Sequence, residues 1–228
     1  GRGAHVRHVR IVPSSSEGRR GNRRRAARPF RKGMTMASGP FRFIETAFLP
    51  GEVAYTGAEL RSHFIREKGG ILGDGVVAFV GACAVGSADL VDLEDAEAGS
   101  EIASARMIHF IGEHFQCALR EANLRLRLLV SIAGDALDEM APRARVVRRG
   151  DDLYVGDRKL SVAIATSTPV SAVFHFGVND DPRGAPVRAI GLVELGVEAK
   201  SFALAVLDRY AAECESIERA LRKVRAVP

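Results

Sequence analysis

Three side chains in the segment 148–179 have types and spacing that suit chemistry on a carboxylate or a phosphate. Asp152, Lys159 and His175 each lie at or near the end of a short apolar run. A lysine ammonium stabilises negative charge that develops on phosphoryl and acyl oxygens, and an aspartate can hold that lysine or a Mg²⁺ ion. A plainer interpretation fits the same residues: Lys159 and Asp152 form a surface ion pair, and His175 is a hydrogen-bonded core residue.

Three mutually antiparallel strands are predicted to position these residues. Gly156-Asp157 separates two apolar runs, which is typical of a tight hairpin because glycine readily adopts a positive φ. Beyond the turn, side chains should alternate between two faces of a strand. We expect one face to lie in the core and the other to leave open space for a ligand beside small residues. The core face holds Leu160, Val162 and Ile164, and the open face holds Lys159, Ser161, Ala163 and Ala165.

This stretch resembles lipoate protein ligases, which carry Asn-Asp-Leu, a hairpin, a lysine before small residues, and a strand with His-Gly. The matching residues here are Asp151-Asp152-Leu153, Lys159-Leu160-Ser161 and His175-Phe176-Gly177. From Tyr55 to Val227 the chain more closely resembles an uncharacterised family, domain of unknown function 366, notably at 73–79, 109–111 and 159–166. That family is similar to the lipoate/biotin ligase fold group, which is akin to class II aminoacyl-tRNA synthetases. The resemblance implies an α+β domain with a mainly antiparallel central sheet flanked by helices.

The resemblance also implies a function. A strand-borne lysine assists carboxylate activation in the ligases, and this role passes to Lys159. The implied activity is that of a ligase or acyltransferase with ATP and Mg²⁺ as cofactors, a small carboxylic acid or acyl group as substrate, and an acyl-carrier protein as partner. Ser161, Ala163, Gly177 and Asn179 would lie near the nucleotide or acyl group. The alternative is a non-catalytic protein that binds a nucleotide or acyl compound in the same cleft.

A second candidate region precedes an apolar run at 75–85, which is expected to be a buried central strand. Lipoate ligases wrap the acyl-adenylate with Arg-Arg ahead of a Gly-Gly-Gly loop, and Arg66, Gly69 and Gly70 keep one arginine and two glycines of that pattern. Glycine N–H groups can cradle a phosphate. A plain connection to the strand from a helix expected at 58–67 explains the loop equally well.

Two further polar pairs depend on the predicted elements. Segment 89–95 alternates well enough for a strand, on which Asp92 and Glu94 would share a face and could hold Mg²⁺. A solvated edge followed by a helix cap is the alternative. Segment 102–118 has helical periodicity, which would place Glu113 four residues after His109 and let it tune this histidine for proton transfer. A structural hydrogen-bonded pair is the alternative there.

The remaining periodic segments complete the expected domain. A strand at the edge of the sheet is expected at 41–49, and a helix at 124–139 should end before Ala141-Pro142. The last helix is expected at 199–224, where apolar residues recur at spacings of 4 and 3. This pattern fits either packing on the domain's own sheet or a homodimer.

The net positive charge of the chain comes from its first 33 residues. The first 33 residues hold ten Arg, one Lys and one Glu, so the rest carries 22 basic against 27 acidic residues. We expect residues 1–36 to be a disordered basic tail and 40–228 to be a single domain. A nucleic-acid arm, a transit peptide or upstream DNA translated in frame before Met34 or Met36 would each explain the tail. Phe30 is its only aromatic residue, which argues against nucleic-acid binding.

Cysteine usage and hydropathy bear on the location of the protein. Cys83, Cys117 and Cys214 are odd in number, far apart and in apolar surroundings, so reduced core residues and a cytoplasmic location are expected. No apolar run approaches the ~18 residues that span a bilayer, so no membrane association is expected.

Overall fold

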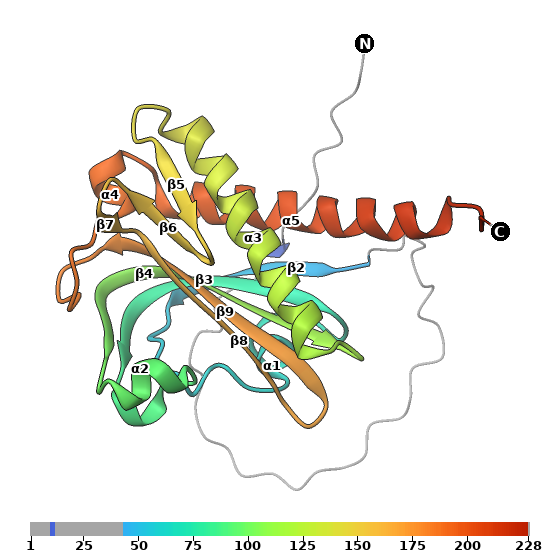
Figure 1. Cartoon of the computed structure of the whole chain (residues 1–228), viewed down its shortest axis with the longest axis horizontal. Coiled ribbons are helices and arrows are strands. Elements are labelled where there is room, and N and C mark those ends of the chain that lie inside the picture. Colours follow the sequence, from blue (N-terminus) through green and yellow to red (C-terminus); the bar gives the residue numbers. More distant parts are fainter. Residues whose placement is uncertain (1–9, 12–42, 228) are drawn as a thin grey trace, which may run out of the picture.

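A six-stranded sheet forms the centre of the molecule. The computed structural model describes residues 10–11 and 43–227. Along the sheet the strands follow the order β1, β2, β3, β4, β9, β8 (Figure 1). Neighbours are parallel between β1 and β2 and between β2 and β3, and antiparallel elsewhere. Their bounds are β1 Arg10–Ile11, β2 Glu45–Glu52, β3 Gly75–Val85, β4 Ile102–Phe115, β8 Ser161–Ser167 and β9 Ser171–Asp181.

A second, three-stranded antiparallel sheet leads into β8. It consists of β5 Val146–Arg149, β6 Asp152–Val155 and β7 Arg158–Lys159. Leu160 joins the two sheets: its N–H donates to the carbonyl of Leu153 in β6, and its carbonyl accepts from the N–H of Asn179 in β9. The chain therefore changes sheets immediately after Lys159.

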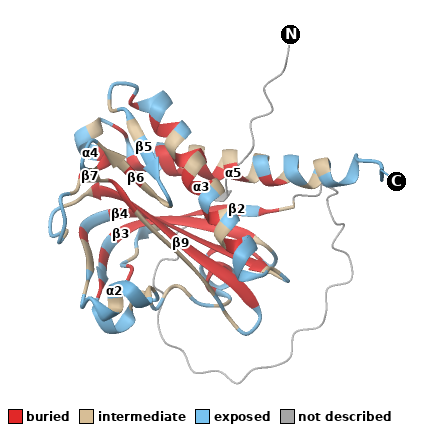
Figure 2. Cartoon of the chain, viewed as in Figure 1, coloured by how far each residue is buried: buried red, intermediate tan, exposed pale blue. Residues whose placement is uncertain are grey.

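Two long helices cover one face of the large sheet. α3 Leu119–Met140 and α5 Ala199–Arg222 cross this face, and the short α4 Leu192–Leu195 precedes α5 (Figure 1). The main core lies between the helices and the sheet, where the residues that face each other are buried (Figure 2). Large buried side chains fill it, among them Phe110, Phe174 and Phe176 from the strands and Leu126, Phe202 and Tyr210 from the helices.

The opposite face is covered only in part. α1 Phe64–Gly69 packs Phe64 and Ile65 against Val77, Phe79 and Ile111 of the sheet. The connection from β3 to β4 holds a 3₁₀ turn at Ser87–Asp89 and the short helix α2 Leu93–Glu97. The middle strands are therefore buried on both faces, whereas part of the sheet beside the β3–β4 connection stays open.

The expected fold class is confirmed, and the predicted element at 75–85 coincides with β3. Helices predicted at 124–139 and 199–224 correspond to α3 and α5. The first half of α5 packs on its own domain, whereas Ile217 and Leu221 near its end are exposed. Residues 45–52 form β2, which is not at the edge because β1 pairs with it.

Two predicted elements are wrong, and a third has different bounds. The helix expected at 102–118 is the strand β4, because a strand covered on both faces has no period-two alternation to show. The strand expected at 89–95 is a turn followed by α2. The helix expected at 58–67 begins only at Phe64, because His63 before it has a left-handed conformation with φ 63°.

Other expectations concern the tail, the cysteines and membranes. Residues 1–9 and 12–42 lie outside the described residues, so the predicted disorder stays a prediction there, and residues 10–11 form β1. Cys83 and Cys214 are buried and Cys117 is half-buried, and none of the three forms a disulfide bond. Within 43–227 no helix combines the length and hydropathy that crossing a bilayer requires.

Candidate functional site

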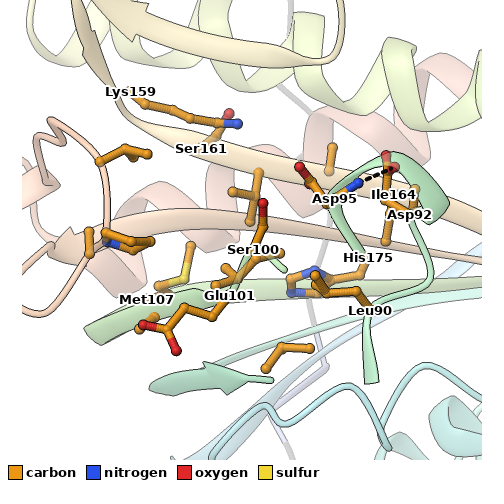
Figure 3. Close-up of a pocket in the computed structure, with 18 of the residues that line it drawn as sticks. Leu90, Asp92, Asp95, Ser100, Glu101, Met107, Lys159, Ser161, Ile164 and His175 are labelled. Atoms are coloured by element: carbon orange, nitrogen blue, oxygen red, sulfur yellow. Dashed lines mark hydrogen bonds between the residues drawn. The ribbon is translucent and has the colours of Figure 1, made fainter. Parts of the chain in front are cut away.

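A cleft of about 470 Å³ opens on the partly covered face of the sheet. One side is formed by the β3–β4 connection, and the other by β8, β9 and the loop after β9 (Figure 3). Its lining includes apolar side chains, among them Leu90, Met107 and Val162. It also includes all three residues that the sequence singled out first, Asp152, Lys159 and His175.

Lys159 is held firmly at one side of this cleft. Its Nζ lies 2.7 Å from a carboxylate oxygen of Asp152, and the two side chains are 31% and 20% exposed. Its backbone N–H donates to the carbonyl of Arg188, and its carbonyl accepts from the N–H of Ile190. Asn179 adds a side-chain hydrogen bond of 3.4 Å to the same carbonyl. The ammonium therefore extends into the cleft from a backbone that is fixed on both sides.

Burial raises the pKa of the Asp152 carboxyl, and the ammonium of Lys159 opposes that shift. Asp151 and Asp95 add to the rise because like charges disfavour ionisation. The cleft is acidic as a whole: within the described lining Lys159 is the only Lys or Arg. Six carboxylates accompany it, those of Asp89, Asp92, Asp95, Glu101, Asp151 and Asp152.

The predicted faces of β8 are wrong beyond Leu160. Ala163 and Ala165 pack toward the helix-covered core, whereas Val162 packs toward the opposite face. The chain changes sheets at Leu160, and this step shifts the alternation by one residue. Ser161 is fully buried, and its Oγ accepts from the N–H of Leu153 at 2.8 Å. Its hydroxyl thus supports the junction between the sheets, although both Ser161 and Ala163 border the cleft.

His175 of β9 also lines the cleft and belongs to a chain of hydrogen bonds. Its Nε2 is 3.0 Å from Nδ1 of His109, whose Nε2 is 3.2 Å from the carbonyl oxygen of Gly81. Burial lowers the pKa of His109 to about 4 and that of His175 well below its usual value. Both rings are therefore neutral near pH 7.

Nδ1 of His175 has no hydrogen-bond partner among the described residues. Every fully buried side-chain nitrogen and oxygen in the same part of the chain has one. Because His175 is only 3% exposed and lines the cleft, this nitrogen must reach the cleft surface. Figure 3 shows the ring well apart from Lys159.

Tyr55 is a residue of the cleft that the sequence analysis missed. Its ring stacks on His175 with 3.8 Å between centroids and an interplanar angle of 8°. Burial raises the pKa of its hydroxyl, which is neutral at physiological pH. Tyr55 belongs to no named strand but forms an isolated bridge to Cys83. Only its tertiary position identifies it, so no periodicity could have found it.

The expected pairing of His109 with Glu113 is wrong. In place of a helix, β4 carries both residues, and Glu113 bonds elsewhere: both carboxylate oxygens accept from the N–H of His63 at 2.9 Å, and one accepts from the Ser171 hydroxyl. Glu113 is buried and fixes the left-handed residue that starts α1. His109 finds His175 instead.

The glycine loop expected to hold phosphate lies outside the cleft lining. Gly69 is buried, and a Cβ there would lie 2.6 Å from Cγ1 of Val77, so its lack of a side chain serves packing. Gly70 ends α1 in a left-handed conformation. Arg66 is exposed, and it does not line the cleft either.

The remaining candidates have structural roles. Asp92 caps α2 by accepting from the N–H groups of Glu94 and Asp95, so the predicted strand face shared by Asp92 and Glu94 does not exist. Within 43–227 no group of three or more His, Cys, Asp or Glu is placed to hold a metal ion. A Cβ at Gly177 would lie 2.8 Å from Cε of Met107, so this glycine lets β9 approach β4 closely.

Comparisons with known proteins agree with the fold. The family model of domain of unknown function 366 matches residues 44–225. An uncharacterised protein of Methanocaldococcus jannaschii is 35% identical over 188 residues, which cover 79% of this chain and 84% of that protein. The solved structure of a protein of unknown function from Pyrococcus horikoshi has a TM-score of 0.76 and 36% identity, and the match covers 81% of this chain and 100% of that one.

Biotin protein ligase from Aquifex aeolicus, solved in complex with biotin and ATP, has a TM-score of 0.50 and 18% identity, with 76% of this chain and 72% of the ligase covered. At this identity the likeness shows a shared fold. The matched span and the 35–36% identity of the two archaeal proteins establish kinship of sequence. The chain belongs to the family defined by domain of unknown function 366, within the fold of the biotin protein ligases.

Proposed function

We propose that the cleft binds a small carboxylic acid and that Lys159 assists its activation by ATP. The observation that carries the proposal is the position of Lys159: it is the one ammonium in the described lining, fixed by Asp152 and by backbone hydrogen bonds on both sides. A carboxylate is the natural partner for such a group. The shared fold with a biotin ligase that binds biotin and ATP supports the same assignment.

In the proposed reaction a carboxylate oxygen of the acid attacks the α-phosphorus of ATP. The bond to the bridging oxygen breaks, pyrophosphate leaves with its electrons, and an acyl-adenylate remains. Negative charge grows on the phosphoryl and acyl oxygens during this step, and the Lys159 ammonium lies where it would stabilise that charge. An acceptor such as an acyl-carrier protein would then take the acyl group and release AMP.

Mg²⁺ has no ready-made site among the described residues. The ion usually enters with nucleotide phosphates, retains water ligands and uses only one or two protein carboxylates. Asp151 and Asp152 fit that limited role, because both line the cleft and are only partly buried. Their contribution would be to offset phosphate charge through the ion, since without it they repel phosphates.

The second candidate function is binding without activation. Arg66 and Gly70, which would contact phosphates in a ligase, do not line the cleft, and every charged residue in the described lining except Lys159 is acidic. A cleft with this charge favours an acyl compound with one carboxylate over a polyphosphate. The protein would then carry or sense the acyl compound and release no pyrophosphate.

Titration calorimetry and pyrophosphate release separate the two functions. The full chain is titrated with ATP–Mg²⁺ and with a panel of small carboxylic acids, as wild type, Lys159→Ala and Arg158→Ala. Arg158 is the matched control because it precedes Lys159 but pairs with Glu194 outside the cleft. The ligase proposal expects saturable binding and pyrophosphate release in wild type and Arg158→Ala.

For Lys159→Ala we expect pyrophosphate release to fall by ~100-fold or more, the usual effect of removing a group that stabilises transition-state charge. Carboxylate binding that depends on Lys159 but yields no pyrophosphate would favour the binding protein. Equal turnover in wild type and Lys159→Ala would refute the role of Lys159.

A further inference from the structure

The hydrogen-bond chain that ends at His175 fixes which nitrogen of each ring carries a hydrogen. The carbonyl of Gly81 can only accept, so Nε2 of His109 is the donor toward it. Nδ1 of the neutral His109 is then a bare acceptor, and Nε2 of His175 donates to it. The neutral His175 consequently presents the lone pair of Nδ1 to the cleft.

Burial keeps this nitrogen an acceptor. His175 is enclosed by the stacked Tyr55 ring and by His109, and burial disfavours a charged imidazolium there. A carboxylate could not bind to Nδ1 because it also has only lone pairs to offer. The group that satisfies Nδ1 must therefore be an N–H or O–H donor, and a neutral one suits the low polarity of the surroundings.

The two ends of the cleft thus select opposite chemistry. Lys159 attracts an anion, whereas His175 accepts a hydrogen bond, and the two lie apart in Figure 3 with Leu90 and Met107 among the side chains drawn in the same cleft. We propose that the ligand is a small carboxylic acid whose far end carries a neutral N–H or O–H group that donates to Nδ1 of His175. The carboxylate of this ligand rests on the proposed function. Its donor group rests on the geometry of His175 alone.

The donor end is tested first, on the wild-type protein. Imidazolidinone, a neutral cyclic urea without a carboxylate, is titrated into protein whose histidine rings are labelled with ¹⁵N. We expect the Nδ1 signal of His175 to move while the signals of His114 stay, because both nitrogens of His114 already have partners, Asp74 and Tyr210. The N,N′-dimethyl derivative, which has no donor, should leave the His175 signal in place. An unmoved His175 signal, or an equal shift with both compounds, would overturn the inference.

The second test joins the two ends in one ligand. Calorimetry compares ω-hydroxyoctanoate with nonanoate, in which a methyl group replaces the hydroxyl. Wild type should bind the hydroxy acid about tenfold more tightly, the effect of one neutral hydrogen bond, and His175→Phe should lose this preference. Equal affinity of wild type for both acids, or a preference that persists in His175→Phe, counts against the inference.

The two tests also separate this inference from the proposed function. Lys159-dependent binding of both acids without a preference would leave the proposed function intact and overturn the donor site. A His175 response to the cyclic urea with no binding of any carboxylate would support the donor site and defeat the proposed function. His175→Phe leaves Nδ1 of His109 without a donor and could prevent folding. In that case the ¹⁵N titration decides, because it uses the wild-type protein.

Discussion

Two buried histidines on neighbouring strands behave differently because they lie on opposite faces of the sheet. His114 of β4 lies on the helix-covered face, where Nδ1 is 3.1 Å from Asp74 and Nε2 is 3.3 Å from the Tyr210 hydroxyl. His175 of β9 lies on the cleft face and, among residues 43–227, has a partner at Nε2 only. Both are almost fully buried. Burial therefore does not distinguish a structural histidine from a binding one, whereas an unused nitrogen lone pair does.

The largest effect of a single substitution is expected on the covered face, for Tyr210→Ala. This side chain is fully buried, meets the edge of Phe174 and completes the partners of His114. Its loss should reduce the free energy of unfolding by ~3–5 kcal/mol, as measured by urea denaturation. Tyr154→Ala in the small sheet is the control and should cost clearly less, because Tyr154 is only partly buried. A stable Tyr210→Ala protein that no longer binds ligand would break the comparison.

The second prediction is that acid destabilises the folded protein through the two buried histidines of the cleft face, His109 and His175. The pKa of His109 falls from 6.5 to about 4 on folding, and that of His175 also falls, both because of burial. The unfolded chain therefore takes up these protons first. The free energy of unfolding should stay level above pH 6.5 and decline as the pH drops toward 4, by about 1.4 kcal/mol per pH unit for each proton.

Urea denaturation across this pH range measures the decline. His109→Gln removes one of the two titrating groups and should flatten the slope, since glutamine still offers a donor to Gly81 and an acceptor to His175. His63→Asn is the control, because His63 is exposed and asparagine tolerates its left-handed conformation. A slope that His109→Gln leaves unchanged would show that other groups cause the acid sensitivity.

The smallest effect is expected in the glycine loop at 69–73, and it tests whether this loop belongs to the cleft. Gly69→Ala should cost ~1–3 kcal/mol because its Cβ would collide with Val77. Gly73→Ala is the matched control: nothing lies within 4 Å of its Cβ, so the change should be neutral or stabilise by ~0.4–1 kcal/mol. Both variants should keep the wild-type affinity for ATP–Mg²⁺ in calorimetry. A stable Gly69→Ala protein with weakened ATP binding would return this loop to the site.

The sequence predicted elements where pattern and environment agree. β3 is a continuous apolar run because both of its faces are buried, and α3 shows one apolar stripe because only one side meets the core. β4 has the sequence pattern of a helix because buried residues on both of its faces, such as Met107, Ile108 and Ile111, also satisfy helical spacing. Length would have reinforced the error, since fourteen residues are typical of a helix and long for a strand.

The candidate site was predictable only in part. Asp152, Lys159 and His175 line one cleft, as their order along three strands suggested. The partner of His109 was not predictable, because His175 lies 66 residues away and only strand pairing brings the rings together. The side-chain alternation of β8 failed for a related reason: a change of sheet at Leu160 leaves no mark in the pattern of residue types.

Leu160 also decides how the cleft can move. One residue supplies its N–H to the small sheet and its carbonyl to the large one, so the backbone that carries Lys159 cannot swing away from β9, which carries His175, without breaking hydrogen bonds on both sides. Closure of the cleft by a movement of Lys159 relative to β9 would therefore break these hydrogen bonds. A ligand must fit a spacing that exists before it arrives, so chain length should matter as much for affinity as the groups at its ends.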